Sequence, residues 1–224
     1  VADDDEHRMD TLADLARLWM SPLGRERNAL ETWERVLDID PGHVEALAAL
    51  ADGHRRSGQT VELVDALTRL VTAGDPSRDA ERLVEAYVEL GNLYLSDAYA
   101  QTPEALDCFE NALALAPYER RALDAAERIY ADDEDFAGVV RVKLRRGKHA
   151  EQVRVASREL EEAAELARVR LQDPEVEIEV VEAWLGRDEH SEPAFERAVE
   201  LYRRLDRTDD LTTLLISRVE TSED

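Results

Sequence analysis

Apolar residues recur along most of the chain at the spacing of one buried helix face, i, i+3, i+4 and i+7. One such stripe covers residues 83–94, and a second covers residues 105–113, after which Pro117 ends the helix. Residues 176–180 alternate glutamate with valine and isoleucine, as a strand would, but they follow Asp173-Pro174, which is typical of a helix start. The pattern therefore predicts helices throughout and essentially no sheet.

One motif occurs twice with identical spacing. Both copies carry a small residue, an aromatic residue, a second small or branched residue and a proline: Ala29, Trp33, Val36 and Pro41, then Ala105, Phe109, Ala112 and Pro117. A partner helix precedes each copy and carries a leucine, a small residue and an aromatic residue: Leu15, Ala16 and Trp19, then Leu90, Gly91 and Tyr94. Weaker copies recur around residues 50–70, 126–147 and 198–215. The motif predicts a chain built from repeated two-helix units.

These residues resemble the tetratricopeptide repeat (TPR) family, whose unit of about 34 residues consists of two helices. The length of 224 residues leaves room for about six units of a bacterial-type array. We expect these units near residues 8–42, 43–76, 79–118, 119–148, 149–190 and 191–221. The fifth is the most degenerate, because Arg170 stands where the family has tyrosine. The resemblance implies an all-α, right-handed superhelical α-solenoid of helix-turn-helix hairpins. We expect a single repeat domain over residues 1–224, as part of a longer chain.

Size complementarity gives the motif a physical reason. Two helices of a hairpin approach closely only where one of them presents a small residue, so Gly91 and Ala112 are expected to form a notch for Tyr94 or Phe109. Each hairpin leaves one apolar face uncovered, and the next hairpin covers it. The stack therefore buries a continuous core through contacts between neighbours.

Acidic residues outnumber basic residues 52 to 28, which gives a net charge of −24. This excess disfavours nucleic acid as a partner, because phosphate binding requires clustered lysine and arginine. Cys108 is the only cysteine, which is typical of a reducing compartment. No apolar stretch reaches the roughly 18 to 20 residues of a membrane span, and the chain begins with acidic residues, unlike a signal peptide. We therefore expect a cytoplasmic protein without membrane insertion.

The sequence shows no catalytic or metal-binding pattern. Its histidines are scattered without zinc-binding spacing, and no glycine-rich phosphate loop occurs. We interpret the acidic run 132–135 as a solvated turn rather than a catalytic carboxylate pair, and Cys108 as an inert helix residue rather than a nucleophile. The tryptophans are interpreted as packing residues: Trp19, Trp33 and Trp184. We predict no catalytic residue, no metal site and no cofactor, and hence no enzyme.

TPR arrays are interaction scaffolds, so the resemblance implies that the chain binds a partner peptide or domain along a concave groove lined by the first helix of each unit. The repeat register places these residues in the groove: Arg17, Asp52, Arg55, Asn92, Arg121, Arg128 and Arg168. The family's clamp for a terminal carboxylate uses lysine and asparagine; Asn92 is present, and Arg121 or Arg128 would replace lysine. The net charge favours a basic or mixed-charge partner. The alternative is a regulatory or sensory domain that binds a small ligand or a signalling peptide.

A basic stretch at residues 141–158 departs from the overall charge and contains both lysines of the chain. Its first basic residues are Arg141, Lys143, Arg145, Arg146 and Lys148. These side chains either form a docking patch for an acidic partner or balance acidic neighbours within the protein. The second interpretation is favoured, because a chain with a net charge of −24 gains from internal charge balance.

Overall fold

The computed structural model describes residues 2–21 and 24–222, and this part of the chain forms helices and no strand. The helices are α1 (Ala2–Met20), α2 (Glu26–Leu37), α3 (Val44–Ser57), α4 (Thr60–Ala73), α5 (Pro76–Tyr94), α6 (Thr102–Leu115), α7 (Arg120–Asp132), α8 (Phe136–His149), α9 (Val153–Leu166), α10 (Pro174–Arg187), α11 (Glu192–Arg204) and α12 (Thr208–Ser222). A π-helical turn, η1 (Ala167–Leu171), follows α9. The predicted all-α fold is confirmed.

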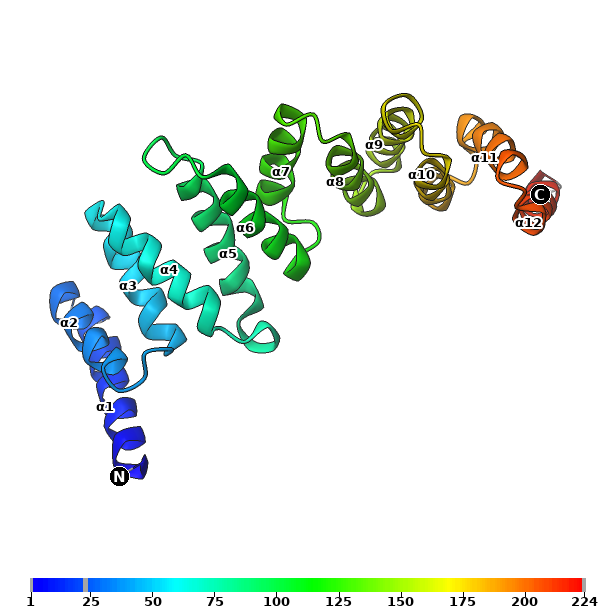
Figure 1. Ribbon diagram of the computed structural model, residues 1–224. Coiled ribbons are helices and arrows are strands. Elements are labelled where there is room, and N and C mark those ends of the chain that lie inside the picture. Colours follow the sequence, from blue (N-terminus) through cyan, green and yellow to red (C-terminus); the bar gives the residue numbers. More distant parts are fainter. Residues whose placement is uncertain (1, 22–23, 223–224) are drawn as a thin grey trace. The chain divides into compact units, whose positions relative to one another are not determined.

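The chain divides into two compact units, unit 1 over Val1–Glu119 and unit 2 over Arg120–Asp224. Within each unit, every helix packs on the next one along the chain (Figure 1). Short turns join the helices, which pair as the hairpins α1–α2, α3–α4 and α5–α6 in unit 1 and α7–α8, α9–α10 and α11–α12 in unit 2. Each hairpin overlaps an expected repeat range, and along the sequence the division between the units falls near the boundary of the third and fourth ranges. The single domain and the right-handed superhelix stay predictions.

Aspartate side chains cap the starts of α8 and α10. The side chain of Asp173 accepts hydrogen bonds from the backbone N–H groups of Glu175 at 3.0 Å and Val176 at 3.2 Å, and Pro174 occupies the first turn of α10. This cap fixes the alternating segment 176–180 as helix, as predicted from the Asp-Pro pair. The acidic run 132–135 starts at the last residue of α7 and continues through the turn before α8, where Asp135 accepts a hydrogen bond from the Gly138 N–H at 2.9 Å.

Gly91 and Gly147 lie where a neighbouring helix approaches closely. A Cβ atom added to Gly91 on α5 would lie 2.8 Å from the ring of Phe109 on α6, and that ring is fully buried. The expected notch therefore holds Phe109. In unit 2, a Cβ atom on Gly147 of α8 would lie 2.3 Å from Leu160 of α9. Any larger side chain at these positions forces the helices apart.

Each unit has its own apolar core. The core of unit 1 gathers buried leucines, alanines and Trp33 from its helices, and the core of unit 2 gathers buried aliphatic residues, Trp184 and Tyr202. Trp33 and Trp184 are packing residues, as expected. Trp19 is half-buried and lies under the guanidinium group of Arg25, 5.3 Å from the ring centroid.

The degenerate fifth repeat has a structural counterpart in η1. This π-helical turn is followed by its C-cap residue Gln172, whose φ of 54° places it in the left-handed region. Arg170, which replaces the tyrosine of the motif, lies with its guanidinium carbon 3.9 Å from the centroid of the Phe136 ring on α8. Arg170 therefore joins two consecutive hairpins through a cation–π contact.

We predict that Gly91→Leu lowers the free energy of unfolding by about 1 to 3 kcal/mol, because the new side chain would overlap the buried Phe109 ring. The matched control is Gly186→Leu on α10, where a Cβ atom would meet nothing within 4 Å. Urea unfolding followed by circular dichroism measures both variants. Equal stability of the two would contradict the close approach of α5 and α6.

Candidate interaction surface

Ion pairs connect the first helices of consecutive hairpins in unit 1. Arg17 on α1 donates a hydrogen bond from Nε to Glu45 Oε1 on α3 at 2.7 Å, and a second from Nη2 to Glu45 Oε2. The same guanidinium group also binds Asp14, one turn earlier on α1, at 2.7 Å. Arg17 therefore joins two carboxylates across adjacent repeats.

The next pair of repeats has the same arrangement. Arg55 on α3 donates to Glu89 on α5, from Nε at 2.6 Å and from Nη2 at 2.5 Å, and it also binds Asp52 on its own helix. Asp14 and Arg17 thus correspond to Asp52 and Arg55, with the same spacing along α1 and α3. We call these contacts the unit 1 ladder: Asp14, Arg17 and Glu45, then Asp52, Arg55 and Glu89.

The ladder changes the role of the groove residues expected in unit 1. Arg17, Asp52 and Arg55 are exposed on the first helices, and their charges are already matched by other charges of unit 1. Hydrogen bonding to Arg17 lowers the pKa of Glu45, which keeps this carboxylate charged. Asn92 is exposed on α5 and donates from Nδ2 to the carbonyl oxygen of Val88 at 2.8 Å. The structure thus provides partners for these side chains that sequence reasoning missed, above all Glu45 and Glu89.

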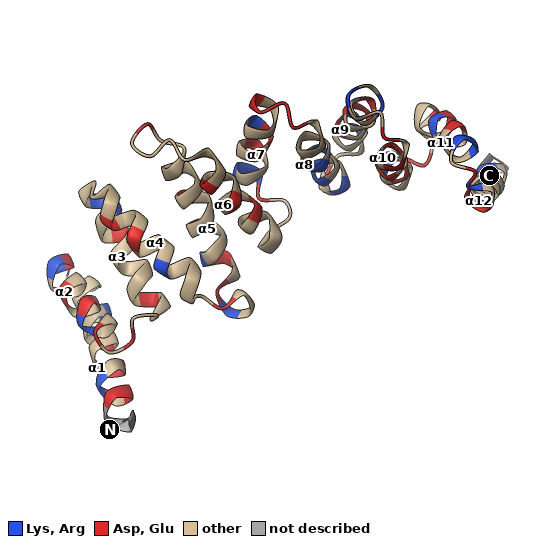
Figure 2. Ribbon diagram, in the orientation of Figure 1, with Lys and Arg blue, Asp and Glu red and all other residues tan. Residues whose placement is uncertain are grey.

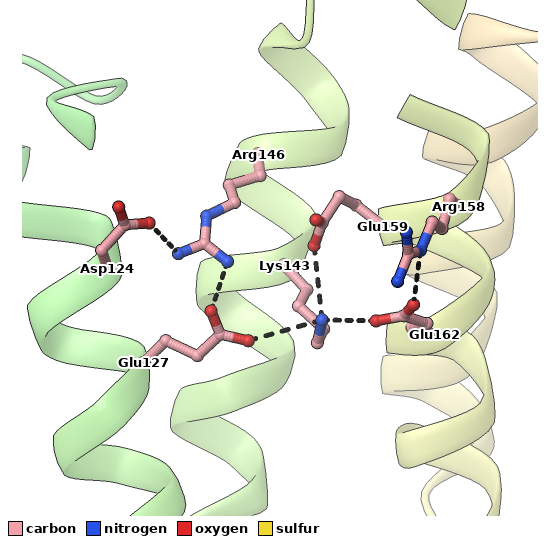
Figure 3. Close-up of polar contacts among 7 residues, drawn as sticks. All are labelled: Asp124, Glu127, Lys143, Arg146, Arg158, Glu159 and Glu162. Atoms are coloured by element: carbon pink, nitrogen blue, oxygen red, sulfur yellow. Dashed lines mark hydrogen bonds and ion pairs between the residues drawn. The ribbon is translucent and has the colours of Figure 1, made fainter. Parts of the chain in front are cut away.

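A second charge network spans α7, α8 and α9 in unit 2 (Figure 3). Lys143 on α8 is only 12% exposed, and its Nζ atom lies 2.6 Å from Glu162, 3.3 Å from Glu159 and 3.4 Å from Glu127. Burial alone would lower the pKa of this ammonium group, but the three carboxylates outweigh it and raise the pKa above its ordinary value. Lys143 therefore remains charged at the centre of the network.

The other members extend the network on both sides of Lys143. Arg146 on α8 donates to Asp124 on α7 at 2.7 Å and also binds Glu127. On α9, Arg158 donates to Glu162 at 3.0 Å. Helix α8 is thus held to both of its neighbours by charge-assisted hydrogen bonds in addition to its apolar contacts.

Much of the basic stretch is therefore engaged inside unit 2, where Figure 2 shows blue segments along α8. Besides Lys143 and Arg146, Lys148 lies 3.7 Å from Glu179, and Arg141 donates to the hydroxyl group of Tyr130 at 3.1 Å. Arg145 is half-buried and also has an interaction partner. These contacts support the interpretation of internal charge balance. Docking of an acidic partner here stays a prediction.

Unit 2 also contains a cleft of about 670 Å³, lined by residues of α8, α9, η1, α10 and α11. Its lining residues are Lys143, Glu161, Glu162, Ala164, Glu165, Leu166, Arg168, Glu177, Trp184, Pro193 and Arg197. The first helices of the fifth and sixth repeats, α9 and α11, contribute to its walls. We call this feature the unit 2 cleft.

Two buried polar groups belong to the wall of the unit 2 cleft. Glu177 on α10 is 1% exposed and accepts a hydrogen bond from Nε of Arg197 on α11. Trp184 is 6% exposed, and its Nε1–H finds no acceptor among the described residues. A buried donor without an acceptor costs about 1 to 3 kcal/mol of stability. The wall of the cleft thus contains a polar group whose hydrogen-bonding capacity is unused in the free chain.

The groove residues expected in unit 2 lie in different places. Arg168 lines the cleft, and its Nε donates to Glu165 at 3.0 Å. Arg121 and Arg128 are exposed on α7 and do not line the cleft. The expected register therefore brings Arg168 to the cleft, while Glu161 and Trp184 are lining residues that sequence reasoning did not assign to a groove. The signal that could have found Glu161 is its position on the first helix of a repeat.

Other candidate chemistry is weak in the described part of the chain. Cys108 is buried, and burial raises the pKa of its thiol to about 11, so it stays protonated at neutral pH. No cluster of histidine, cysteine and carboxylate side chains there has the geometry of a metal site. Across the same residues, no helix combines the length and apolar character required to cross a membrane.

Repeated hairpins with the TPR-like motif at their contacts define a helical-repeat protein. No family model and no curated protein matches the chain. A tetratricopeptide repeat protein from Parabacteroides merdae is similar at 15% identity and a TM-score of 0.48, over 95% of this chain and 79% of its own. YrrB, described as a TPR protein with an unusual peptide-binding site, is similar at 16% identity and a TM-score of 0.45, over 83% of this chain and 89% of its own. MamA is similar at 20% identity and a TM-score of 0.45, over 73% of this chain and 84% of its own. With TM-scores below 0.5, these similarities carry no inference about binding residues.

We predict that Glu162→Gln weakens the acid dependence of stability. Hydrogen bonds from Lys143 and Arg158 lower the pKa of the Glu162 carboxyl below its ordinary value of 4.5. The ion pairs therefore stabilise the fold above the unfolded pKa, and this contribution is lost as the pH falls through the lower, folded pKa. Because Glu162 is partly exposed, the contribution is about 1 kcal/mol or less.

Urea unfolding at a series of pH values from neutral to acidic measures this effect, with Glu161→Gln on the same helix as the matched control. The Glu162→Gln variant should lose less stability on acidification than the parent, and the control should follow the parent. Parallel curves for all three proteins would show that the network does not hold Glu162 in its charged form.

Proposed function

We propose that the chain is a non-catalytic interaction module that binds a segment of a partner protein. The unit 2 cleft is its main binding site. The cleft itself is the observation that carries this proposal. Its volume of about 670 Å³ falls in the range typical of ligand sites, about 300 to 1,000 Å³. It combines apolar walls with charged side chains, as protein interfaces do.

The groove expected along the first helices of unit 1 is part of the same proposal. The unit 1 ladder holds α1, α3 and α5 in a fixed relation, so a partner meets a pre-organised surface rather than separate mobile side chains. A net charge of −24 attracts basic or mixed-charge partners and repels nucleic acid. The cytoplasmic location stays a prediction from composition.

The alternative function, a sensory domain for a small ligand or a signalling peptide, would use the same cleft. The two functions differ in the size of the bound surface, because a protein segment continues beyond the cleft onto the neighbouring first helices. Cross-linking at defined positions separates them.

We predict that a photoreactive amino acid at Pro193, which is exposed and lines the cleft, cross-links a partner polypeptide in an extract of the source cell. The matched control places the same amino acid at Glu196, which is exposed on the same helix and lies outside the lining. Mass spectrometry should identify one polypeptide enriched at Pro193 and not at Glu196. A cross-linked small molecule would favour the sensory function. Equal capture at both positions, or no capture at either, would contradict binding of the partner in the cleft.

A further inference from the structure

The cations that line the unit 2 cleft are all held by carboxylates of the protein. Lys143 contacts three glutamates of the network, and Arg168 donates to Glu165. Arg197 binds the buried Glu177 and also Glu200, at 2.5 Å. A ligand carboxylate would therefore have to compete with an existing ion pair at each of these positions.

One carboxylate of the cleft stands apart from these ion pairs. Glu161 lies on α9, is exposed, and has no ion-pair partner among the residues that the structure describes. Glu165, one turn further along α9, is also exposed beside its single partner Arg168. The charge that the cleft offers to a ligand is therefore negative, in agreement with the sign of the whole chain.

The remaining walls are apolar and contain an unused donor. Ala164, Leu166, Trp184 and Pro193 line the cleft together with the charged residues. The Trp184 Nε1–H is covered in the free chain and has no acceptor among the described residues. A bound backbone that moves aside the side chains above it can supply a carbonyl acceptor, which an apolar small molecule cannot.

We propose that the unit 2 cleft recognises a protein segment in which an arginine or lysine stands next to a large apolar residue. This inference rests on the proposed interaction function and specifies its chemistry. The cationic group pairs with Glu161, with Glu165 nearby, while the apolar side chain packs on Trp184 and Pro193. The segment thus meets the negative charge and the apolar wall at the same time, whereas an acidic segment meets only cations that already have partners.

Three blocked, fluorescently labelled peptides of equal length test this inference on the full chain by anisotropy. The first alternates arginine with leucine, the second glutamate with leucine, and the third arginine with serine. The arginine–leucine peptide should bind at least about tenfold more tightly than either of the others, because only it satisfies both requirements. Equal affinity for all three, or no binding of the first, would overturn the inference.

A pair of charge reversals locates the binding. Glu161→Lys removes a carboxylate that has no described ion pair, so the fold should be unaffected. The variant should lower the affinity for the arginine–leucine peptide by about tenfold. Glu196→Lys changes the net charge equally outside the cleft and should alter the affinity by less than about twofold. Equal weakening by both variants would show that binding follows overall charge and would overturn the assignment to the cleft. Cross-linking at Pro193 tests the proposed interaction function independently, because that experiment captures the natural partner and does not use the peptides.

Discussion

The fold depends on how an excess of negative charge is accommodated between helices that pack side by side. Carboxylates outnumber lysine and arginine 52 to 28, and like charges on adjacent helices oppose close packing. In unit 1, Arg17 and Arg55 each bind a glutamate on the first helix of the next repeat. In unit 2, Lys143 on α8 pairs with glutamates on α7 and α9, and Arg146 pairs with carboxylates on α7. Because these cations are engaged inside the protein, the charge that remains open at the unit 2 cleft is negative.

Close approach of the helices is the second requirement, and it connects the packing to the binding surface. Phe109 fits against Gly91 in unit 1, and Leu160 fits against Gly147 in unit 2. The contact at Gly147 brings α8 against α9, which places Lys143 within reach of Glu162 and both residues at the edge of the cleft. Apolar fit and charge pairing therefore fix the same helices, and a pre-organised cleft loses less entropy when a partner binds.

Much of the fold could be predicted from the sequence, because the helix period and the TPR-like spacing are local signals. The notch at Gly91 followed from the sizes of neighbouring residues. The ion-pair partners of Arg17 and Arg55 could not be predicted in this way. The register between neighbouring hairpins decides which of the 52 carboxylates lies opposite each arginine, and the sequence does not show that register. The shared spacing of Asp14 and Arg17 with Asp52 and Arg55 was a signal for the ladder. The cleft was missed because Trp184 both packs in the core and lines a surface, and sequence shows only the first role.

The most direct test of the central claim is a charge exchange across the ladder. Urea unfolding would be measured for Arg55→Glu, for Glu89→Arg and for the variant that carries both changes. The two side chains meet across α3 and α5, so each single reversal places like charges together and should lower the free energy of unfolding by about 1 kcal/mol. The exchanged pair should regain part of that loss, because opposite charges face each other again across α3 and α5, while the contact of Arg55 with Asp52 is not restored. A double variant that loses as much stability as the two single variants combined would contradict the role of the ladder.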